Sequence, residues 1–282
     1  MVNDPAAPKH CVIEETIAQP IANVSDFLVA KTGLSKGRVK HALNCGALRV
    51  KKHKGGLQRL RRATASIPAG SKLSFHYDEA LLALKSAPAE LLEDNNEYSV
   101  WFKPPGMLSQ GTEWGDHCSM LRFVEQYFEN KRQVFLVHRL DRDACGLMLV
   151  AHSGSMADKL SRLFSSREME KHYQVRVVGH PVQTEMTIDL NLDGKEARTH
   201  TKVVGADDVS SLLNVTIETG RKHQIRRHLS LNGHPVVGDP LYGEKHPQGL
   251  HLSAVLLRFL CPVRGRKVEV IVPSEKIRNY WS

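Results

Sequence analysis

The chain has 282 residues, of which 41% are hydrophobic and 24% are charged, and its formal net charge at pH 7 is +9. This composition supports a packed core and excludes a disordered or fibrous chain, and the length suits one large domain or a medium domain with a small one. No apolar run approaches the roughly 20 residues of a membrane-spanning helix, and the first ten residues lack the apolar stretch of a secretory signal. We therefore expect a cytoplasmic protein without a membrane partner.

The cysteines are odd in number and scattered, and no two of them form a Cys-x-x-Cys pair. They are Cys11, Cys45, Cys118, Cys145 and Cys261. This distribution predicts free thiols and argues against a disulfide framework or a zinc site.

The positive charge is concentrated near the N-terminus. Residues 27–77 contain twelve Lys or Arg and no Asp or Glu, whereas the rest of the chain has 27 basic and 30 acidic residues. Such a segment attracts a polyanion and releases its counterions. The alternative is a solvated basic face that aids solubility, although solubility does not require the absence of every acid over about fifty residues.

The basic segment predicts a small unit with two helices. The first helix covers residues 25–31, with Ser25 or Asp26 as its N-cap and Gly33 as its stop. The second helix runs from the N-cap Ser35 to about residue 44, and the glycine at position 46 follows as its stop.

Short strands complete this unit. Residues 47–50 and 71–77 predict strands, and a basic turn over residues 51–62 lies between them. Residues 79–96 change from basic to acidic and include Pro88, so we interpret them as a linker.

Strands outnumber helices after residue 96, and few neighbours fit a βαβ unit. The predicted strands are 98–103, 134–140, 146–152, 171–179 and 212–220, and the predicted helices are 119–130, 153–164 and 223–231. We therefore expect an α+β fold, in which a mixed, mostly antiparallel sheet with flanking helices follows the small α/β domain.

A polar segment, residues 138–143, separates two apolar strands. A loop held between buried strands is a common place for reactive side chains. Asp141, beside Arg139, would be an ionised carboxylate able to act as nucleophile, general base or cation stabiliser. A turn aspartate that caps local backbone amides is an equally good interpretation of the composition.

Basic and aromatic residues farther along the chain are further candidates. The helix over residues 223–231 carries Arg226 and Arg227, which would bind phosphate or pair with a buried carboxylate. His223 and His228 are five residues apart, about 140° around a helix, so they do not form a metal pair. Tyr173 lies on the apolar face of a strand, where a core role is usual and stacking on a base is the alternative.

Several motifs resemble one enzyme family. HRLD, GLMLVAHS, KHYQVRVVG and GRKHQIRRHLSLNGHPVVGDPLYG, with the earlier WFKPPGMLSQGT, are similar to the motif series of the RluA-type pseudouridine synthases over residues 97–275. The histidine before Arg139 favours this branch, because the small-subunit type usually has glycine there. The segment SDFLVAKTGLSKGRVKHALNCGALRV resembles an S-four-type RNA-binding domain. The resemblance implies an RNA-binding domain at 15–80 and a catalytic domain at 92–282.

The resemblance implies an isomerase that converts a specific uridine in structured ribosomal or transfer RNA into pseudouridine, without cofactor or metal. Asp141 would be the catalytic residue and would attack either the base or the sugar. Arg139 would hold the flipped-out nucleotide, Tyr173 would pack on its base, and Arg226 would keep Asp141 ionised. The implied RNA-binding residues of the N-terminal domain are Lys36, Arg38, Lys40, Arg49, Lys51 and Lys52.

One departure and two alternatives accompany this interpretation. Ala144 and Cys145 stand where the family usually has Thr-Ser, so two hydroxyls that would support the loop are missing. A non-catalytic RNA-binding or ribosome-assembly factor with a degenerate synthase domain is the first alternative. The second is an unrelated hydrolase, which would need a second acid or base such as Asp143. We expect a monomer, and the sequence does not identify the RNA or the uridine.

Overall fold

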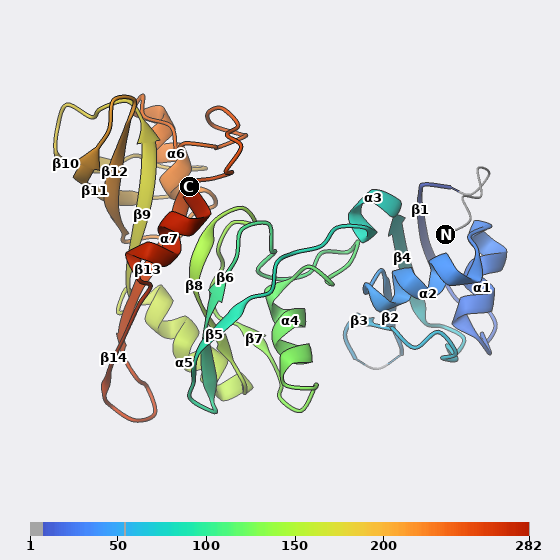
Figure 1. Cartoon of the computed structure of the whole chain (residues 1–282). Helices are drawn as coiled ribbons and strands as arrows, with labels where there is room; N and C mark the ends of the chain where they lie inside the picture. The colour runs from blue at the N-terminus through green and yellow to red at the C-terminus, as the bar shows by residue number, and fades with distance from the viewer. Residues whose placement is uncertain (1–7, 54, 282) are drawn as a thin grey trace. The chain divides into compact units, whose positions relative to one another are not determined.

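The computed structural model describes residues 8–53 and 55–281, and the chain divides into two compact units (Figure 1). Unit 1 comprises Met1–Lys85 and Gln110–Phe123, and unit 2 comprises Ser86–Ser109 and Val124–Ser282. None of the helices in the described ranges is long and apolar enough to cross a membrane.

Unit 1 is a four-stranded antiparallel sheet with two packed helices and a short third one. The strand order is β1-β4-β2-β3. The strands are β1 (His10–Thr16), β2 (Leu48–Lys51), β3 (Gln58–Arg59) and β4 (Lys72–Asp78), and the helices are α1 (Val24–Thr32), α2 (Lys36–Asn44) and α3 (Glu79–Leu82). The apolar faces of α1, α2 and the sheet enclose a core that includes Leu28, Leu43 and Phe75.

The predicted helix ends of unit 1 are confirmed except at one position. Ser35 caps α2 by accepting the backbone N–H of Arg38, and Gly33 ends α1 in the left-handed conformation. The predicted N-cap of α1 is wrong, because Asn23 takes that place and accepts the N–H groups of Ser25 and Asp26. An asparagine side chain reaches the free amides of the first turn as well as serine does.

The segment Gln110–Phe123 belongs to unit 1 although it lies between stretches of unit 2 in the sequence. Asp116 forms an ion pair with Arg59 and accepts a hydrogen bond from Arg61, and its backbone N–H donates to the Cys45 carbonyl at 2.9 Å. The Trp114 ring lies 4.8 Å from the ring of His10. Two of the twelve basic residues near the N-terminus therefore hold this segment.

Unit 2 is built on a large mixed sheet with the order β10-β11-β12-β9-β13-β8-β6-β5, in which β14 also pairs with β13 and β7 with β8. The strands are β5 (Glu90–Asp94), β6 (Tyr98–Lys103), β7 (Phe135–Leu136), β8 (Cys145–Ala151), β9 (Glu170–Val178), β10 (Glu185–Asp189), β11 (Arg198–Ala206), β12 (Ser210–Ile217), β13 (Leu252–Leu260) and β14 (Lys267–Ile271). The one parallel pair on this path is β8 with β13. The predicted α+β class with a mixed, mostly antiparallel sheet is confirmed.

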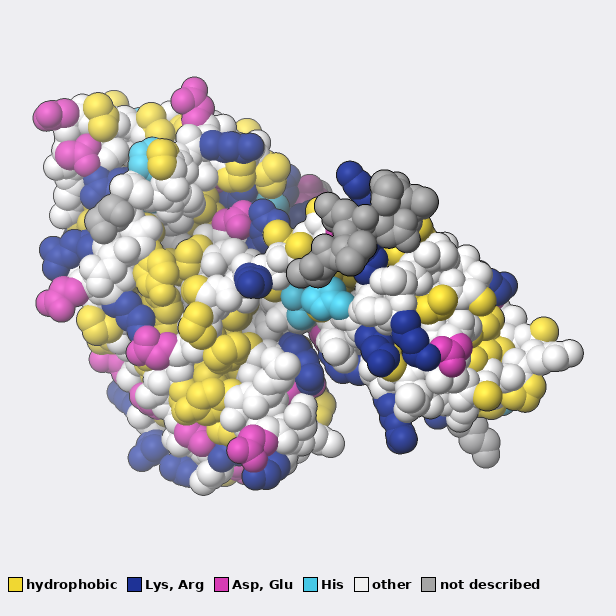
Figure 2. Space-filling view, turned by 45° about the vertical axis from the view of Figure 1, so that its right-hand side comes forward, with side chains coloured by type: hydrophobic (Ala, Val, Ile, Leu, Met, Phe, Trp, Pro, Cys, Tyr) yellow, Lys and Arg dark blue, Asp and Glu magenta, His cyan; other side chains and the backbone are white. Residues whose placement is uncertain are grey.

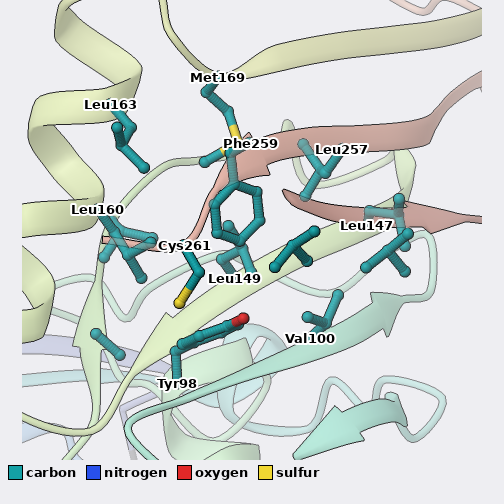
Figure 3. Close-up of a cluster of buried hydrophobic side chains, with 14 of the residues drawn as sticks. Tyr98, Val100, Leu147, Leu149, Leu160, Leu163, Met169, Leu257, Phe259 and Cys261 are labelled. Atoms are coloured by element: carbon teal, nitrogen blue, oxygen red, sulfur yellow. The ribbon is translucent and has the colours of Figure 1, made fainter. Parts of the chain in front are cut away.

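The helices of unit 2 cover parts of this sheet. They are α5 (Gly154–Ser165), α6 (Gln224–Leu231) and α7 (Ser274–Trp281), and α4 (Met120–Tyr127) crosses the boundary between the units in the sequence. Leu160 and Leu163 of α5 pack on Leu149 and Phe259 of the sheet in one apolar core (Figure 3). A second core joins α6 to β9 and β12, and Val175, Val215 and Leu229 belong to it.

Three sequence predictions were incomplete or wrong. The predicted linker over residues 79–96 contains α3 and β5, because Leu82 is buried in the core of unit 1 and β5 pairs with β6. The predicted basic turn includes the short strand β3. The predicted strand 134–140 is limited to β7, because the chain leaves the sheet after Leu136. Strands β1, β10, β11, β13 and β14 were not predicted.

Gly146 makes possible the close approach of β8 and β13 at the parallel pair. It has a φ angle of +116°, and a Cβ at this position would lie 2.2 Å from the Ala254 carbonyl oxygen. We predict that Gly146→Ala lowers the free energy of unfolding by about 2–4 kcal/mol, because backbone rather than a flexible side chain would have to move.

Urea denaturation followed by circular dichroism measures this effect. Gly154→Ala is the matched control, because Gly154 lies in the first turn of α5 with open space around its Cβ position. The control is expected to be neutral or slightly stabilising. Equal unfolding midpoints for the two variants would contradict the close-packing argument.

Candidate active site

A pocket of about 520 Å³ opens in unit 2 where the loop between β7 and β8 faces α6 and the start of β9. The residues that line it come from the polar loop, from α5, from β9 and from the segment leading into α6. They are Leu136–Asp141, Ala144, Ser161, Phe164, Ser165, Lys171, Tyr173, Ile217, Gly220, Arg221, His223–Arg226 and Leu252. Four residues that the sequence singled out, Arg139, Asp141, Tyr173 and Arg226, lie together in this lining.

The polar loop is held by buried groups behind it. The Lys103 ammonium at the end of β6 donates to the carbonyls of Pro104, Met107 and Arg142 at 2.9–3.0 Å. Burial lowers the pKa of Lys103 to about 8, so the group remains charged at neutral pH and keeps three donors. The next loop adds Ser109, whose hydroxyl donates to the Leu140 carbonyl at 2.7 Å and accepts the Leu140 N–H at 3.0 Å. The backbone on both sides of Asp141 is therefore fixed.

Asp141 forms an ion pair with Arg226, which is itself held by a second carboxylate. Arg226 Nη1 donates to Asp141 Oδ2 at 3.0 Å, while Nε and Nη2 each donate to one oxygen of Asp239 at 2.7 Å. The side chains of Arg226 and Asp239 are 5% and 0% exposed, whereas that of Asp141 is 25% exposed. The accessible carboxylate thus has a buried cation behind it.

Asp239 is a fixed anchor for this network. Its Oδ1 also accepts the backbone N–H groups of Leu241 and Tyr242, within the GDPLYG turn. Burial alone would raise the pKa of Asp239, but the hydrogen bonds from Arg226 and from these amides outweigh burial and lower it. Burial opposes the charge of Arg226 as well, yet its bonds to Asp239 and Asp141 raise its pKa. Both groups are charged at neutral pH.

His223 precedes α6 and approaches the other oxygen of Asp141. Its Nε2 lies 3.9 Å from Asp141 Oδ1, and its Nδ1 hydrogen-bonds with the Tyr242 hydroxyl at 3.0 Å. Burial lowers the pKa of His223 and outweighs the opposing effect of the Asp141 charge. The ring is therefore neutral at pH 7.

Aromatic rings form another wall of the pocket. Burial, and secondarily the charge of Asp141, raise the pKa of Tyr173, so its hydroxyl stays protonated. The His138 ring stacks on Phe164 at 4.5 Å and accepts the backbone N–H of Leu149. Burial lowers the pKa of His138 to about 3, with a smaller contribution from Lys171. The rings of Tyr173, His138 and Phe164 are thus uncharged, which suits contact with a planar ring.

Of the other polar residues in the loop, Arg139 lines the pocket, whereas Arg142 and Asp143 do not. Arg139 is exposed at the pocket, and Arg142 pairs with Asp143 at 2.9 Å. Asp143 is therefore engaged by a neighbouring cation and does not line the pocket. Ala144 is buried and lines the pocket, and Cys145 is buried at the start of β8.

The histidine pair considered for a metal has other partners. His228 is fully buried and hydrogen-bonds with the Thr199 hydroxyl and the Leu190 carbonyl. Within residues 8–53 and 55–281, no three His, Cys, Asp or Glu side chains gather so as to hold a metal ion.

The six basic residues proposed for RNA lie in unit 1 and differ in their partners. Lys36 pairs with Asp26, Arg38 pairs with Glu79, and Arg49 donates to the Ser74 hydroxyl. Lys40, Lys51 and Lys52 are exposed and have no acidic partner among the described residues. Most of the charged side chains on the visible face of unit 1 are Lys or Arg, whereas those of unit 2 include both signs (Figure 2).

Comparison with known proteins identifies the family. A family model described as RNA pseudouridylate synthase matches residues 97–231. The chain is 33% identical over 190 residues to a ribosomal large subunit pseudouridine synthase D of Nitrosomonas europaea, covering 61% of this chain and 55% of the relative. It is 30% identical over 208 residues to an uncharacterized RNA pseudouridine synthase of Mycoplasma genitalium, covering 66% of this chain and 67% of the relative.

The fold agrees with this match. The solved structure of human RNA Pseudouridylate Synthase Domain Containing 1 has a TM-score of 0.56 and 25% identity, and the alignment covers 67% of this chain and 86% of that chain. The chain belongs to the RNA pseudouridine synthase family, as its motifs predicted. It spans about half the length of some relatives, including 49% of an uncharacterized RNA pseudouridine synthase of Chloroflexus aurantiacus at 40% identity.

The anchoring role of Asp239 leads to a stability prediction. Asp239→Asn removes the charge that compensates the buried Arg226, and the free energy of unfolding should fall by about 3–5 kcal/mol. Asp193→Asn is the matched control, because Asp193 pairs with Arg227 on the same helix but is 69% exposed. The control should unfold at the wild-type urea concentration. If Asp239→Asn unfolds at the same urea concentration as wild type, the burial of Arg226 does not depend on the charge of Asp239.

Proposed function

We propose that this chain is an RNA pseudouridine synthase that isomerises a specific uridine in structured RNA, with Asp141 as the catalytic residue. The observation that carries the proposal is a carboxylate exposed to the pocket and paired at 3.0 Å with a buried arginine. An ionised carboxylate that a bound nucleotide can reach is able to act as a nucleophile. Membership of the RNA pseudouridine synthase family supports the nucleophilic role of Asp141 over the other roles that an aspartate can have.

The proposed reaction rearranges bonds within one nucleotide. The N1–C1′ bond breaks and its electron pair stays on the uracil, while Asp141 forms a transient bond either to C1′ of the sugar or, beforehand, to the base. The uracil rotates in the pocket and C5 bonds to C1′. The bond to Asp141 breaks and its electron pair returns to the carboxylate, the proton on C5 leaves, and N1 gains a proton. The sum is a redox-neutral isomerisation, so we propose no cofactor and no metal.

The lining supports separate roles for the other residues. Arg226 would keep Asp141 ionised as substrate displaces water from the pocket. Tyr173, with a protonated hydroxyl, would pack on the uracil ring. Arg139, exposed at the pocket, would hold the backbone of a nucleotide extruded from its helix.

We also propose that unit 1 binds RNA as an S-four-type domain. Its two packed helices and antiparallel sheet carry Lys36, Arg38, Lys40, Arg49, Lys51 and Lys52. Phosphate contacts from these residues would supply affinity, while the pocket would supply discrimination.

Ribosomal RNA is the substrate that we propose first. Two relatives are named ribosomal large subunit pseudouridine synthases D and C, from Nitrosomonas europaea and Vibrio cholerae. Transfer RNA is the second candidate. We also propose that the chain acts in the cytoplasm as a monomer.

The catalytic role of Asp141 is tested by mapping pseudouridines in total RNA. Cells that lack the protein should regain pseudouridine at one or a few uridines when wild type is restored. Restoring Asp141→Asn should leave these uridines unmodified, with a loss of at least about 10³-fold in rate in purified reactions.

Asp143→Asn is the control for this experiment, because Asp143 lies two residues away and pairs with Arg142 outside the pocket. It should restore modification. If wild type restores no pseudouridine and yet binds RNA, the chain is the non-catalytic factor, and the Ala144-Cys145 departure becomes its explanation. If Asp141→Asn restores modification, another residue is the nucleophile.

The role of unit 1 is tested by changing Lys51 and Lys52 together to alanine. Loss of two phosphate contacts should weaken RNA binding about tenfold or more at physiological salt and reduce the slope of log affinity against log salt by about 1.5–2. Lys202→Ala is the control, because Lys202 is exposed but lies on β11 of unit 2. If the slope of log affinity against log salt is unchanged, Lys51 and Lys52 do not contact phosphate in the proposed interface.

A further inference from the structure

Lys171 is a charged residue of the pocket to which the proposed mechanism gives no role. It lies on β9 two residues before Tyr173, and side chains two apart on a strand share one face. Both residues line the pocket. The ammonium is therefore directed to the same space as the proposed base-stacking tyrosine.

Lys171 has no acidic partner among the described residues. Its interaction is with the Phe164 ring, whose centroid lies 5.8 Å from Nζ. The adjacent acid, Glu170, belongs to the opposite face of the strand, where it pairs with Arg258 and His172. Burial lowers the pKa of Lys171. A half-buried cation without a counterion is costly, and a substrate that becomes negatively charged would supply the missing counterion.

The pocket separates its charged groups. Asp141 lies with Arg226 and His223, whereas Lys171 lies with Phe164 and His138. Tyr173 lines the same pocket and follows Lys171 by two residues on β9. A uracil on Tyr173 with its sugar toward Asp141 would present its far edge to Lys171.

We infer that Lys171 is a further catalytic residue, which stabilises the uracil anion formed when the N1–C1′ bond breaks. This inference rests on the proposed function and holds for either route of attack, because the electron pair stays on the uracil in both. The negative charge spreads over N1, O2 and O4, and an ammonium directed to a carbonyl oxygen binds the anion more strongly than neutral uridine. Interactions that strengthen in the transition state raise the rate rather than the affinity.

The test uses the full chain, single-turnover conditions and transcripts of large-subunit ribosomal RNA made with uridine or with 5-fluorouridine. Fluorine withdraws electrons and stabilises the uracil anion, so the fluorinated base needs less help from a cation. Lys171→Met should slow formation of pseudouridine from uridine about 100-fold and consumption of 5-fluorouridine about tenfold or less. C5 of the fluorinated base has no proton to lose, so its rearranged product keeps the fluorine and takes up water at C6 instead of becoming pseudouridine. Nuclease digestion and mass spectrometry therefore measure the pseudouridine formed and the 5-fluorouridine consumed, and filter binding measures affinity, which should change less than about threefold.

Two further variants serve as controls. Lys171→Arg keeps the charge and should recover much of the rate. Lys159→Met removes an exposed charge of α5 outside the pocket lining and should behave as wild type. Circular dichroism checks folding, and Lys171→Gln replaces Lys171→Met if the latter is unfolded.

Three outcomes would overturn the inference. The first is an unchanged rate for Lys171→Met. The second is an equal loss on both transcripts, and the third is weaker, salt-dependent binding at an unchanged rate, which would assign Lys171 to an RNA phosphate. A wild-type chain that converts neither transcript, nor any uridine in transfer RNA, would instead overturn the proposed function, and this inference would fall with it.

Discussion

The active-site geometry depends on one buried guanidinium shared by two carboxylates. Asp239 occupies Nε and Nη2 of Arg226, so Nη1 is the nitrogen that contacts Asp141. Because Asp239 is tied to backbone amides of its own turn, the position of this nitrogen is set before any substrate arrives. Asp141 and Arg226 are 85 residues apart in the sequence, and their ion pair also joins the polar loop to α6.

The polar loop is constrained from the sheet side as well. Lys103 holds the backbone after Asp141, Ser109 holds the backbone before it, and Gly146 lets β13 approach directly behind. None of these contacts uses a hydroxyl at positions 144 or 145. The two missing hydroxyls of the family motif therefore leave these supports of the loop in place, and buried Ala144 packs with Val175 and Leu252 in the apolar core.

The sequence predicted the fold class and the elements whose side chains alternate or repeat clearly. Ser35 and Gly33 identified helix ends, and the motif order placed Asp141, Tyr173 and Arg226 in one family pattern, which the structure brings into one pocket.

Other features depend on contacts between distant parts of the chain and have no local signal. Strands β10, β11 and β14 are short or partly exposed, and their positions follow from pairing partners rather than from their own pattern. Proline and glycine surround Asp239, and this composition by itself indicates only a turn. Its second role appears only when α6 packs beside that turn. Lys103 and Lys171 are similar cases, since a lysine in a strand usually indicates a solvent-facing position.

The interleaving of the two units has a consequence for how this architecture can change. Ser109 supports the polar loop, and the following residue, Gln110, begins the segment that completes unit 1. Deletion of residues 1–85 would therefore not remove all of unit 1. Trp114 and Asp116 would remain, without the His10 ring and the two arginines that contact them. Recombination at a single site after residue 85 would exchange only the first segment of unit 1 and would destabilise the segment that remains. We therefore expect both segments of unit 1 to be inherited together.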